Sequence, residues 1–285
     1  MFDVRFYGVR GSTPCCCPAT HRVGGNTACV LVSIADELPI VFDLGTGLRY
    51  LGEDLKEDLG DSPFRGTALV THLHWDHIQG LPFFTPILRD GSELTIVGPR
   101  QESGSLQEAF ESVLKPPVFP VPLALLPGQM SFVETTADPI QIGSATISAI
   151  EVAHTGITNA YRLETATGSV AYVSDHQQPI DGSLDVPQDV ADFCRGVDLL
   201  IHDAQYDAGE FEMKATWGHS TIAYAVEVAK AADVRRLVLF HHDPTHDDDW
   251  ITSAHRRAQE IAGPELEVLV ATEGLILRSG EPIPR

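Results

Sequence analysis

The segment Thr71-His72-Leu73-His74-Trp75-Asp76-His77 contains four side chains that can bind a metal ion within six residues, directly after the apolar run Ala68-Leu69-Val70. Its three imidazoles and one carboxylate are donors that Zn, Mn and Fe accept in proteins. Capping of backbone groups at a strand end needs one such side chain and does not explain so dense a cluster. The segment therefore predicts a metal centre at the end of a strand.

The spacing of these ligands predicts two metal ions. Residues two apart in an extended segment point the same way, so His72 and His74 can bind one ion as the strand ends. If the chain then turns into a helix, Asp76 and His77 lie on the other side and can bind a second ion close by. We expect two divalent ions, with zinc favoured and manganese or iron as alternatives, since imidazole and carboxylate suit all three metals.

The His-x-His-x-Asp-His pattern of this segment resembles the signature of the metallo-β-lactamase superfamily. In members with two metals, the resemblance implies a distant His for the first ion, a distant Asp that bridges both ions and a late His for the second. By resemblance, the first metal is bound by His72, His74 and His154, the second by Asp76, His77 and His241, and Asp175 bridges them. Each distant ligand follows an apolar or alternating run. Taken alone, a His or Asp there can also cap a helix or bond a carbonyl group.

Length and composition predict one α/β domain that spans residues 1–285. The 285 residues are 43% hydrophobic, which suits a single domain with a substantial core. Apolar and alternating runs predict strands at residues 3–9, 28–34, 39–44, 93–97, 141–152, 160–165, 169–173, 199–202, 237–240 and 267–271. Helices are predicted at 48–59, 105–114, 222–232 after caps at Ser220 and Thr221, and 251–261. Two β-rich halves with outer helices imply a four-layer αββα sandwich, as the resemblance also does, with the metal site at one edge.

Early motifs supply candidates for supporting roles. Asp43, in Phe42-Asp43-Leu44-Gly45, resembles the family's early Asp-x-Gly element, whose carboxylate supports a neighbouring ligand. Capping of the next helix is the other interpretation of Asp43, and both can hold. The elements Arg10-Gly11 and Gly24-Gly25-Asn26-Thr27 resemble loops that face the cleft in a phosphodiesterase-like branch. Arg10 and Asn26 are therefore candidates for substrate binding, although Arg10, like Arg22, could equally be a surface residue.

Late motifs resemble ribonuclease Z and its phosphodiesterase relatives. Trp217-Gly218-His219-Ser220-Thr221, preceded by His202-Asp203-Ala204, resembles the elements in which a His assists the leaving oxygen and an acidic neighbour orients that His. The neighbour here would be Asp203, where the ribonuclease pattern has Glu. The run Phe240-His241-His242-Asp243-Pro244 resembles the same branch, with His241 as ligand, and His242 and His246 are expected to support the ligands or face solvent.

These ligands predict a dinuclear metal-dependent hydrolase. Two bridged ions would lower the pKa of a shared water and leave a bridging hydroxide aimed at an electrophile. The late motifs favour a phosphodiester, with His219 and Asp203 acting at the leaving group and Asp76 counted both as ligand and as catalytic residue. The expected substrate is a small phosphodiester such as a cyclic nucleotide. A lactone, thioester or ester hydrolase with the same site is one alternative, and a non-hydrolytic di-iron redox or sensor protein is the other.

Charge and cysteine usage predict partners and location. The formal charge of −21 argues against a broad surface for a polyanion, so we expect a small anionic phosphodiester substrate and no large nucleic acid. No run approaches the roughly 20 apolar residues of a membrane helix. Five cysteines, three of them adjacent at Cys15-Cys16-Cys17, are a poor disulfide framework and predict a reducing cytoplasm. The cysteine cluster is interpreted as an incidental loop, with a soft metal site as the alternative, and a homodimer is compatible with the resemblance.

Overall fold

A computed structural model describes residues 1–102 and 104–279, and within them the strands form two seven-stranded sheets. In spatial order, the first sheet consists of β14 (Ile276–Arg278), β1 (Phe2–Gly8), β2 (Cys29–Ile34), β3 (Ile40–Phe42), β4 (Arg65–Leu69), β5 (Glu93–Gly98) and β6 (Gln129–Glu134). The second consists of β13 (Glu267–Val270), β12 (Arg236–Phe240), β11 (Leu199–Asp203), β10 (Gly168–Val173), β9 (Asn159–Thr165), β8 (Ala145–Glu151) and β7 (Ile140–Ile142). Residues 280–285, the end of the predicted domain, lie outside the described residues.

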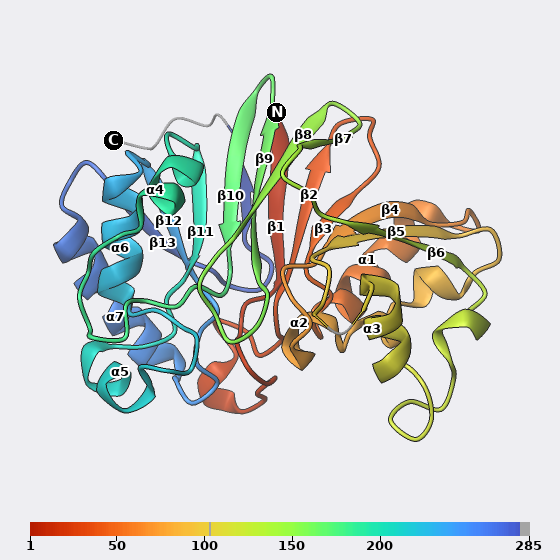
Figure 1. The fold of residues 1–285 in the computed structure, drawn as a ribbon, viewed down its shortest axis with the longest axis horizontal. Coiled ribbons are helices and arrows are strands. Elements are labelled where there is room, and N and C mark those ends of the chain that lie inside the picture. The colour runs from red at the N-terminus through yellow and green to blue at the C-terminus, as the bar shows by residue number, and fades with distance from the viewer. Residues whose placement is uncertain (103, 280–285) are drawn as a thin grey trace.

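The helices of the described residues lie mostly on the two outer sides of the paired sheets (Figure 1). They are α1 (Leu48–Leu59), α2 (Trp75–Ile78), α3 (Leu106–Val113), α4 (Gln188–Cys194), α5 (Ala208–Lys214), α6 (Ile222–Ala231) and α7 (Asp248–Ala262), with short 3₁₀ turns at Pro18–Thr20, Leu81–Phe83, Thr85–Leu88 and Leu123–Leu125. Among the described residues, none of these helices has the length and apolar character that a bilayer crossing requires. The predicted four-layer αββα sandwich is confirmed.

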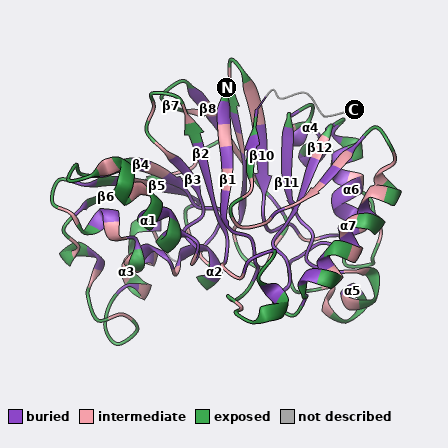
Figure 2. Ribbon diagram, turned by 180° about the vertical axis from the view of Figure 1, so that it is seen from behind, coloured by how far each residue is buried: buried purple, intermediate pink, exposed green. Residues whose placement is uncertain are grey.

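Three apolar clusters explain why the layers pack. One lies between the sheets and includes Phe6, Phe42, Tyr172 and Phe240. The second lies between the second sheet and helices α4, α6 and α7, and the third between the first sheet and helices α1 and α3. The buried strands run through the centre of the molecule while the helices present exposed outer faces (Figure 2). Apolar area removed from water on both faces of each sheet is the main stabilising contribution.

Most predicted elements are present, and the differences have local causes. Helix α1 has the predicted bounds, and Thr221 caps α6 by accepting a hydrogen bond from the N–H of Tyr224. The stretch 141–152 is a hairpin of β7 and β8, because Gly143 turns the chain at a φ of 56°. The sequence reading missed β6, the short helices α4 and α5, and β14, which pairs antiparallel with β1 from the far end of the chain.

Candidate metal centre

The predicted ligands lie at one edge of the sandwich because parallel strands end there together. Strands β10, β11 and β12 are mutually parallel, so Asp175, Asp203 and His241 occur at or just beyond neighbouring carboxyl ends. His72 follows β4 of the other sheet, and His154 follows β8. Loops beyond strand ends keep polar side chains accessible while the strands hold them rigidly. The seven residues predicted as metal ligands are all brought together at this edge.

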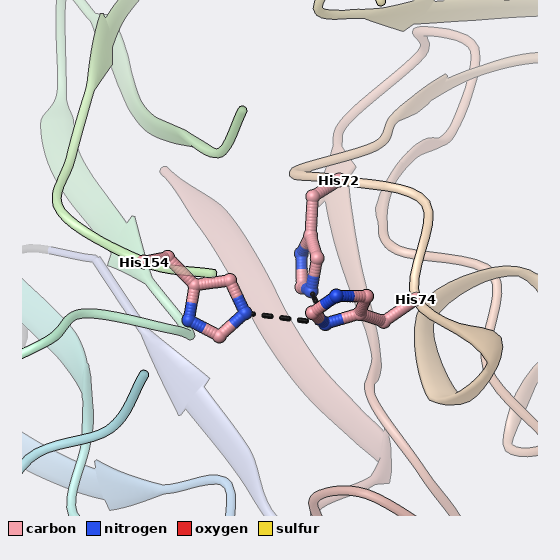
Figure 3. A group of neighbouring side chains, drawn as sticks. All are labelled: His72, His74 and His154. Carbon is pink, nitrogen blue, oxygen red and sulfur yellow. Dashed lines mark hydrogen bonds between the residues drawn. The ribbon is translucent and has the colours of Figure 1, made fainter. Parts of the chain in front are cut away.

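The first group of ligands comprises His72, His74 and His154, whose rings point toward one another (Figure 3). Nδ1 of His74 lies 2.8 Å from Nε2 of His72 and 3.2 Å from Nε2 of His154. Nδ1–H of His154 donates to the carbonyl oxygen of Gly218 at 2.6 Å, so its Nε2 carries the free lone pair. Gly218 has a φ of +94°, and a Cβ there would lie 2.4 Å from Nδ1 of His154. Only glycine fits at this position.

The second group comprises Asp76, His77 and His241, all buried. Nε2 of His77 lies 3.2 Å from Nε2 of His241 and 3.3 Å from Oδ2 of Asp76, and Nε2 of His241 lies 3.1 Å from the same oxygen. The backbone N–H of Ser12 donates to Oδ2 of Asp76 at 2.7 Å. A Cβ on Gly11 would lie 2.4 Å from Nδ1 of His241, so the Gly11-Ser12 turn packs directly on this group.

Asp175 lies between the two groups. Its Oδ1 is 3.2 Å from Nε2 of His77, and its Oδ2 is 3.5 Å from Nε2 of His241. The same Oδ2 lies 3.8 Å from Nε2 of His154 and 3.9 Å from Nε2 of His72. One carboxylate therefore faces both groups, which is the position that a bridging ligand requires.

Asp43 holds the histidines of both groups in one tautomer. It accepts hydrogen bonds from Nδ1–H of His77 at 2.8 Å, from the hydroxyl group of Tyr172 at 2.9 Å and from both the N–H and the hydroxyl group of Thr71. The Thr71 hydroxyl group donates to Asp43, so its lone pair can accept Nδ1–H of His72 at 3.0 Å. Nε2 is thus the ring nitrogen of His72 and of His77 that faces the site.

Thr71 and Tyr172 are functional residues that the sequence interpretation missed. Thr71 immediately precedes the first ligand, which is a usable signal, whereas Tyr172 lies 129 residues from Asp43 in the chain and carries no local signal.

Burial and mutual charge set the protonation of these residues. Burial lowers the pKa of His72 well below its usual range and the pKa of His154 to about 4, so both are neutral, the form that binds metals. Burial alone would also lower the pKa of His77, but the carboxylates of Asp175 and Asp76 outweigh it and raise that pKa well above its usual value. Burial disfavours the ionised form of Asp175, yet His241 and His77 hold its pKa well below the usual range.

The donor set fits two divalent cations. Acceptor atoms of Asp76, His77, Asp175 and His241 converge in a buried space, and Oδ1 of Asp175 has no hydrogen-bond partner among the described residues. Lone pairs on these acceptor atoms, about 3 Å apart, repel one another unless a positive charge lies between them. One site would have three neutral imidazoles, the other would have two imidazoles and a carboxylate, and the two sites would share one carboxylate. Nitrogen and oxygen ligands of this kind suit zinc.

His219 lies beside both groups and is oriented by Asp203. Nδ1–H of His219 donates to Oδ2 of Asp203 at 2.8 Å, while Nδ1 is 3.7 Å from Oδ2 of Asp175. The ring of His219 stacks on that of His241 with centroids 5.0 Å apart. Asp203 is fully buried and also accepts the N–H groups of His176 and Gln205, which fix its carboxylate. The shorter Asp side chain therefore reaches the ring, although the ribonuclease pattern has Glu.

The predicted substrate residues have other contacts. The Arg10 side chain is completely buried and donates to the carbonyl oxygens of Gly24, Asp243 and His246, so it joins loops and is not directed at a ligand. Asn26 donates to Glu273 through both its N–H and its side-chain amide. These positions favour structural roles for both. Exposed Arg22 forms ion pairs with Asp248 and Asp249.

His242 and His246 do not face solvent. Nε2–H of His242 donates to the carbonyl oxygen of Ala271, and burial lowers its pKa to about 3. Its own carbonyl oxygen accepts the N–H of Gly11, so it holds the turn that packs on His241. His246 bonds Glu210 and stacks on Trp250.

Comparisons with known proteins identify the family. Residues 44–242 match the model of the family described as the β-lactamase superfamily domain. The chain belongs to the metallo-β-lactamase superfamily. It is 26% identical to ribonuclease Z of Natronomonas pharaonis over 92% of this chain and 93% of that protein. The predicted branch, which contains ribonuclease Z and phosphodiesterases, is confirmed.

Solved structures share the fold of the superfamily. The metallo-β-lactamase fold protein YhfI of Bacillus subtilis superimposes with a TM-score of 0.71, at 20% identity and with 97% of this chain and 98% of that chain covered. The short form of human tRNase Z superimposes with a TM-score of 0.63, at 21% identity and with 99% and 100% covered. Membership of this fold implies divalent metal ions, which the donor set described above suits.

The relatives correct one prediction. The expectation that no large nucleic acid is a partner is wrong, because the relatives with matching sequence are named ribonuclease Z, a name that denotes cleavage of RNA. The net charge of −21 led to that expectation. Net charge sums the whole surface, whereas a phosphodiester meets only the local field of the cleft, where bound cations add positive charge.

Proposed function

We propose that this protein is a metal-dependent phosphodiester hydrolase. Seven residues would hold two divalent ions, with zinc favoured: His72, His74, His154, Asp76, His77, His241 and the shared Asp175. The relatives named ribonuclease Z support this reaction class, since RNA cleavage is phosphodiester cleavage. When bound, such ions supply a water of lowered pKa and neutralise charge on the phosphate oxygens.

The observation that carries the proposal is the His219–Asp203 pair beside the ligands. The hydrogen bond from Nδ1 of His219 to buried Asp203 leaves Nε2 as the nitrogen that can hold and release a proton. A proton on Nε2 makes the ring cationic, and the Asp203 carboxylate is its counter-charge. A thioester releases a thiolate, which needs less help than an alkoxide that departs from phosphorus, so a positioned acid favours the phosphodiester over a thioester.

Residues around the ligands orient the site. Asp43, with Thr71 and Tyr172, holds the ring nitrogens of His72 and His77 with their lone pairs inward. His74 is the exposed ligand, so substrate approaches from its side of the site. Asp76, held by the N–H of Ser12, keeps the second group closed toward the protein interior.

We propose nucleotide phosphodiesters as the substrate class. The late sequence motifs favour a small diester, such as a cyclic nucleotide, and the ribonuclease Z relatives support an RNA; both present the same scissile group.

The five unpaired thiols support the prediction of a reducing cytoplasm as the location.

The test is turnover of a substrate panel by wild type, Asp76→Ala and the surface control Asp61→Ala, with metal content measured on each sample. The panel contains bis-p-nitrophenyl phosphate, cyclic nucleotides, a short RNA and lactones. We expect diester turnover by wild type and by Asp61→Ala, and at least a hundredfold loss together with loss of metal in Asp76→Ala. A protein that binds two metals but cleaves only lactones contradicts the proposal, and iron with a visible charge-transfer band favours the redox alternative.

A further inference from the structure

Two of the three tryptophans in the chain border the metal centre, and both have exposed side chains. Trp75 follows the ligand His74, and Trp217 precedes Gly218, whose carbonyl oxygen holds His154. The exposed fractions of Trp75 and Trp217 are 50% and 59%. Because Nδ1 of His74 lies 3.2 Å from Nε2 of His154, the backbone segments that carry the two indoles meet at the first metal group.

The backbone that carries Trp217 is held firmly although its ring is exposed. The N–H of Gly218 donates to Oε1 of Gln177 at 2.7 Å, and Nε2 of Gln177 donates to the carbonyl oxygen of Ala215 at 2.9 Å. Nζ of Lys214 lies 5.6 Å from the centroid of the Trp217 ring. These contacts fix the position of the Trp217 backbone and leave the indole ring exposed.

Trp75 is held in a comparable way. It is the first residue of α2, and the next two residues, Asp76 and His77, are buried ligands. The helix therefore cannot rotate without moving the second metal group. Trp75 and the neighbouring ligand His74 are both exposed.

Stability does not explain this pair of exposed indoles. A large apolar side chain stabilises the fold in proportion to the area that it buries, and at least half of the area stays exposed at both positions. Single exposed apolar residues are ordinary on protein surfaces, but two exposed indoles on segments that meet at one site are not scattered. Flat aromatic rings beside a phosphate-binding site suit a nucleobase, because every base has a π face that can stack.

We infer that Trp75 and Trp217 bind the nucleobase carried by the scissile phosphodiester. The inference rests on the proposed function and adds the determinant that selects nucleotide esters over simple ones. Lys214, a cation beside Trp217, is engaged by Asp243 at 2.9 Å and by the rings of Tyr206 and Trp217. Lys214 is therefore not free to bind the phosphate, and the metal centre binds the phosphate while the two indoles bind the base. A free nucleotide diester and the end of an RNA both offer such a base.

The test compares two esters that release the same leaving group, thymidine 5′-(p-nitrophenyl phosphate) and methyl p-nitrophenyl phosphate. The ratio of their kcat/KM values measures recognition of the nucleoside, and the change of that ratio in each Trp variant measures the share that the indole contributes. We expect Trp75→Ala and Trp217→Ala each to lower this ratio about tenfold, mainly through KM, and the Phe variants to restore most of it. Tyr50→Ala, which removes an aromatic ring that is 45% exposed on α1, is the control and keeps the ratio. An unchanged ratio in both Trp variants overturns the inference.

A binding measurement separates this inference from the proposed function. Tryptophan emission is titrated with AMP and with ribose 5-phosphate, which share the phosphate and sugar but differ in the base. Quenching by AMP alone, reduced in each Phe variant, supports stacking even if wild type cleaves no ester and the proposed function fails. Equal quenching by both ligands refutes stacking even if the enzyme is active.

Two further substrates identify the source of the base. Hydrolysis of a cyclic nucleotide and of a short unstructured RNA is measured in the same variants. If the Trp variants lose more of their hydrolysis rate on the cyclic nucleotide, the base belongs to a free nucleotide. If they lose more of it on the RNA, the base belongs to the end of an RNA chain. Both results support the inference. No loss on either substrate contradicts it.

Discussion

The hydroxyl group of Thr71 links the Asp43 carboxylate to the first metal ligand, so its removal should weaken metal binding without removing a ligand. Thr71→Val keeps the shape of the side chain but loses the hydrogen bond to Asp43 and the acceptor for Nδ1–H of His72. A hydrogen bond to a charged group contributes about 1.5–3 kcal/mol, and a buried donor without an acceptor costs about 1–3 kcal/mol. We expect the free energy of unfolding of the metal-free protein to fall by about 3 kcal/mol.

Metal affinity should fall by about 10- to 100-fold in Thr71→Val, the range typical for residues that orient a ligand. Competition with a chromophoric chelator measures both ions, and urea denaturation measures stability. Thr71→Ser keeps the hydroxyl group and should retain affinity. Tyr172→Phe removes another hydrogen bond to Asp43 without touching His72, so it should weaken binding less. If Thr71→Val binds both ions like wild type, the proposed link from Asp43 to His72 does not orient that ligand.

Four other outcomes are expected. His219→Ala should lower kcat by about 10²–10⁴ on substrates with alkoxide leaving groups and far less on p-nitrophenyl esters, whose leaving group needs no proton; equal losses would argue for a binding role. Asp203→Asn should show the same dependence on leaving group, with intact metal content. Gly218→Ala should weaken metal binding because its Cβ would lie 2.4 Å from Nδ1 of His154, whereas Gly182→Ala, at a φ of +79° in open space, should cost only backbone strain; metal analysis of both variants decides. Removal of metal by a chelator should lower the melting temperature by about 10 °C if binding contributes about 4 kcal/mol, and calorimetry measures the shift.

The sequence by itself predicted the candidate ligands and determined the class of fold. Apolar and alternating runs of residues placed His72, Asp175 and His241 at strand ends. Because residues two apart in an extended segment point the same way, His72 was paired with His74. These inferences depend on local geometry, which a dozen neighbouring residues specify. The helix over Leu48–Leu59 was predicted with its observed bounds for the same reason.

The tertiary structure decided everything that depends on contacts between distant segments. Arg10 was predicted to bind the substrate, but its side chain is buried and donates to the carbonyl oxygen of His246, 236 residues away. No local sequence pattern predicts a contact between residues so far apart. The relay from Asp43 to Thr71, His77 and Tyr172 forms because facing sheets bring residues up to 129 positions apart within 3 Å. The first segment, from His72 to His77, can supply ligands to two ions only because parallel strands of the other sheet end opposite it. Packing of the two sheets, and not the ligand motif itself, therefore builds the shared site and sets the two tryptophans at its opening.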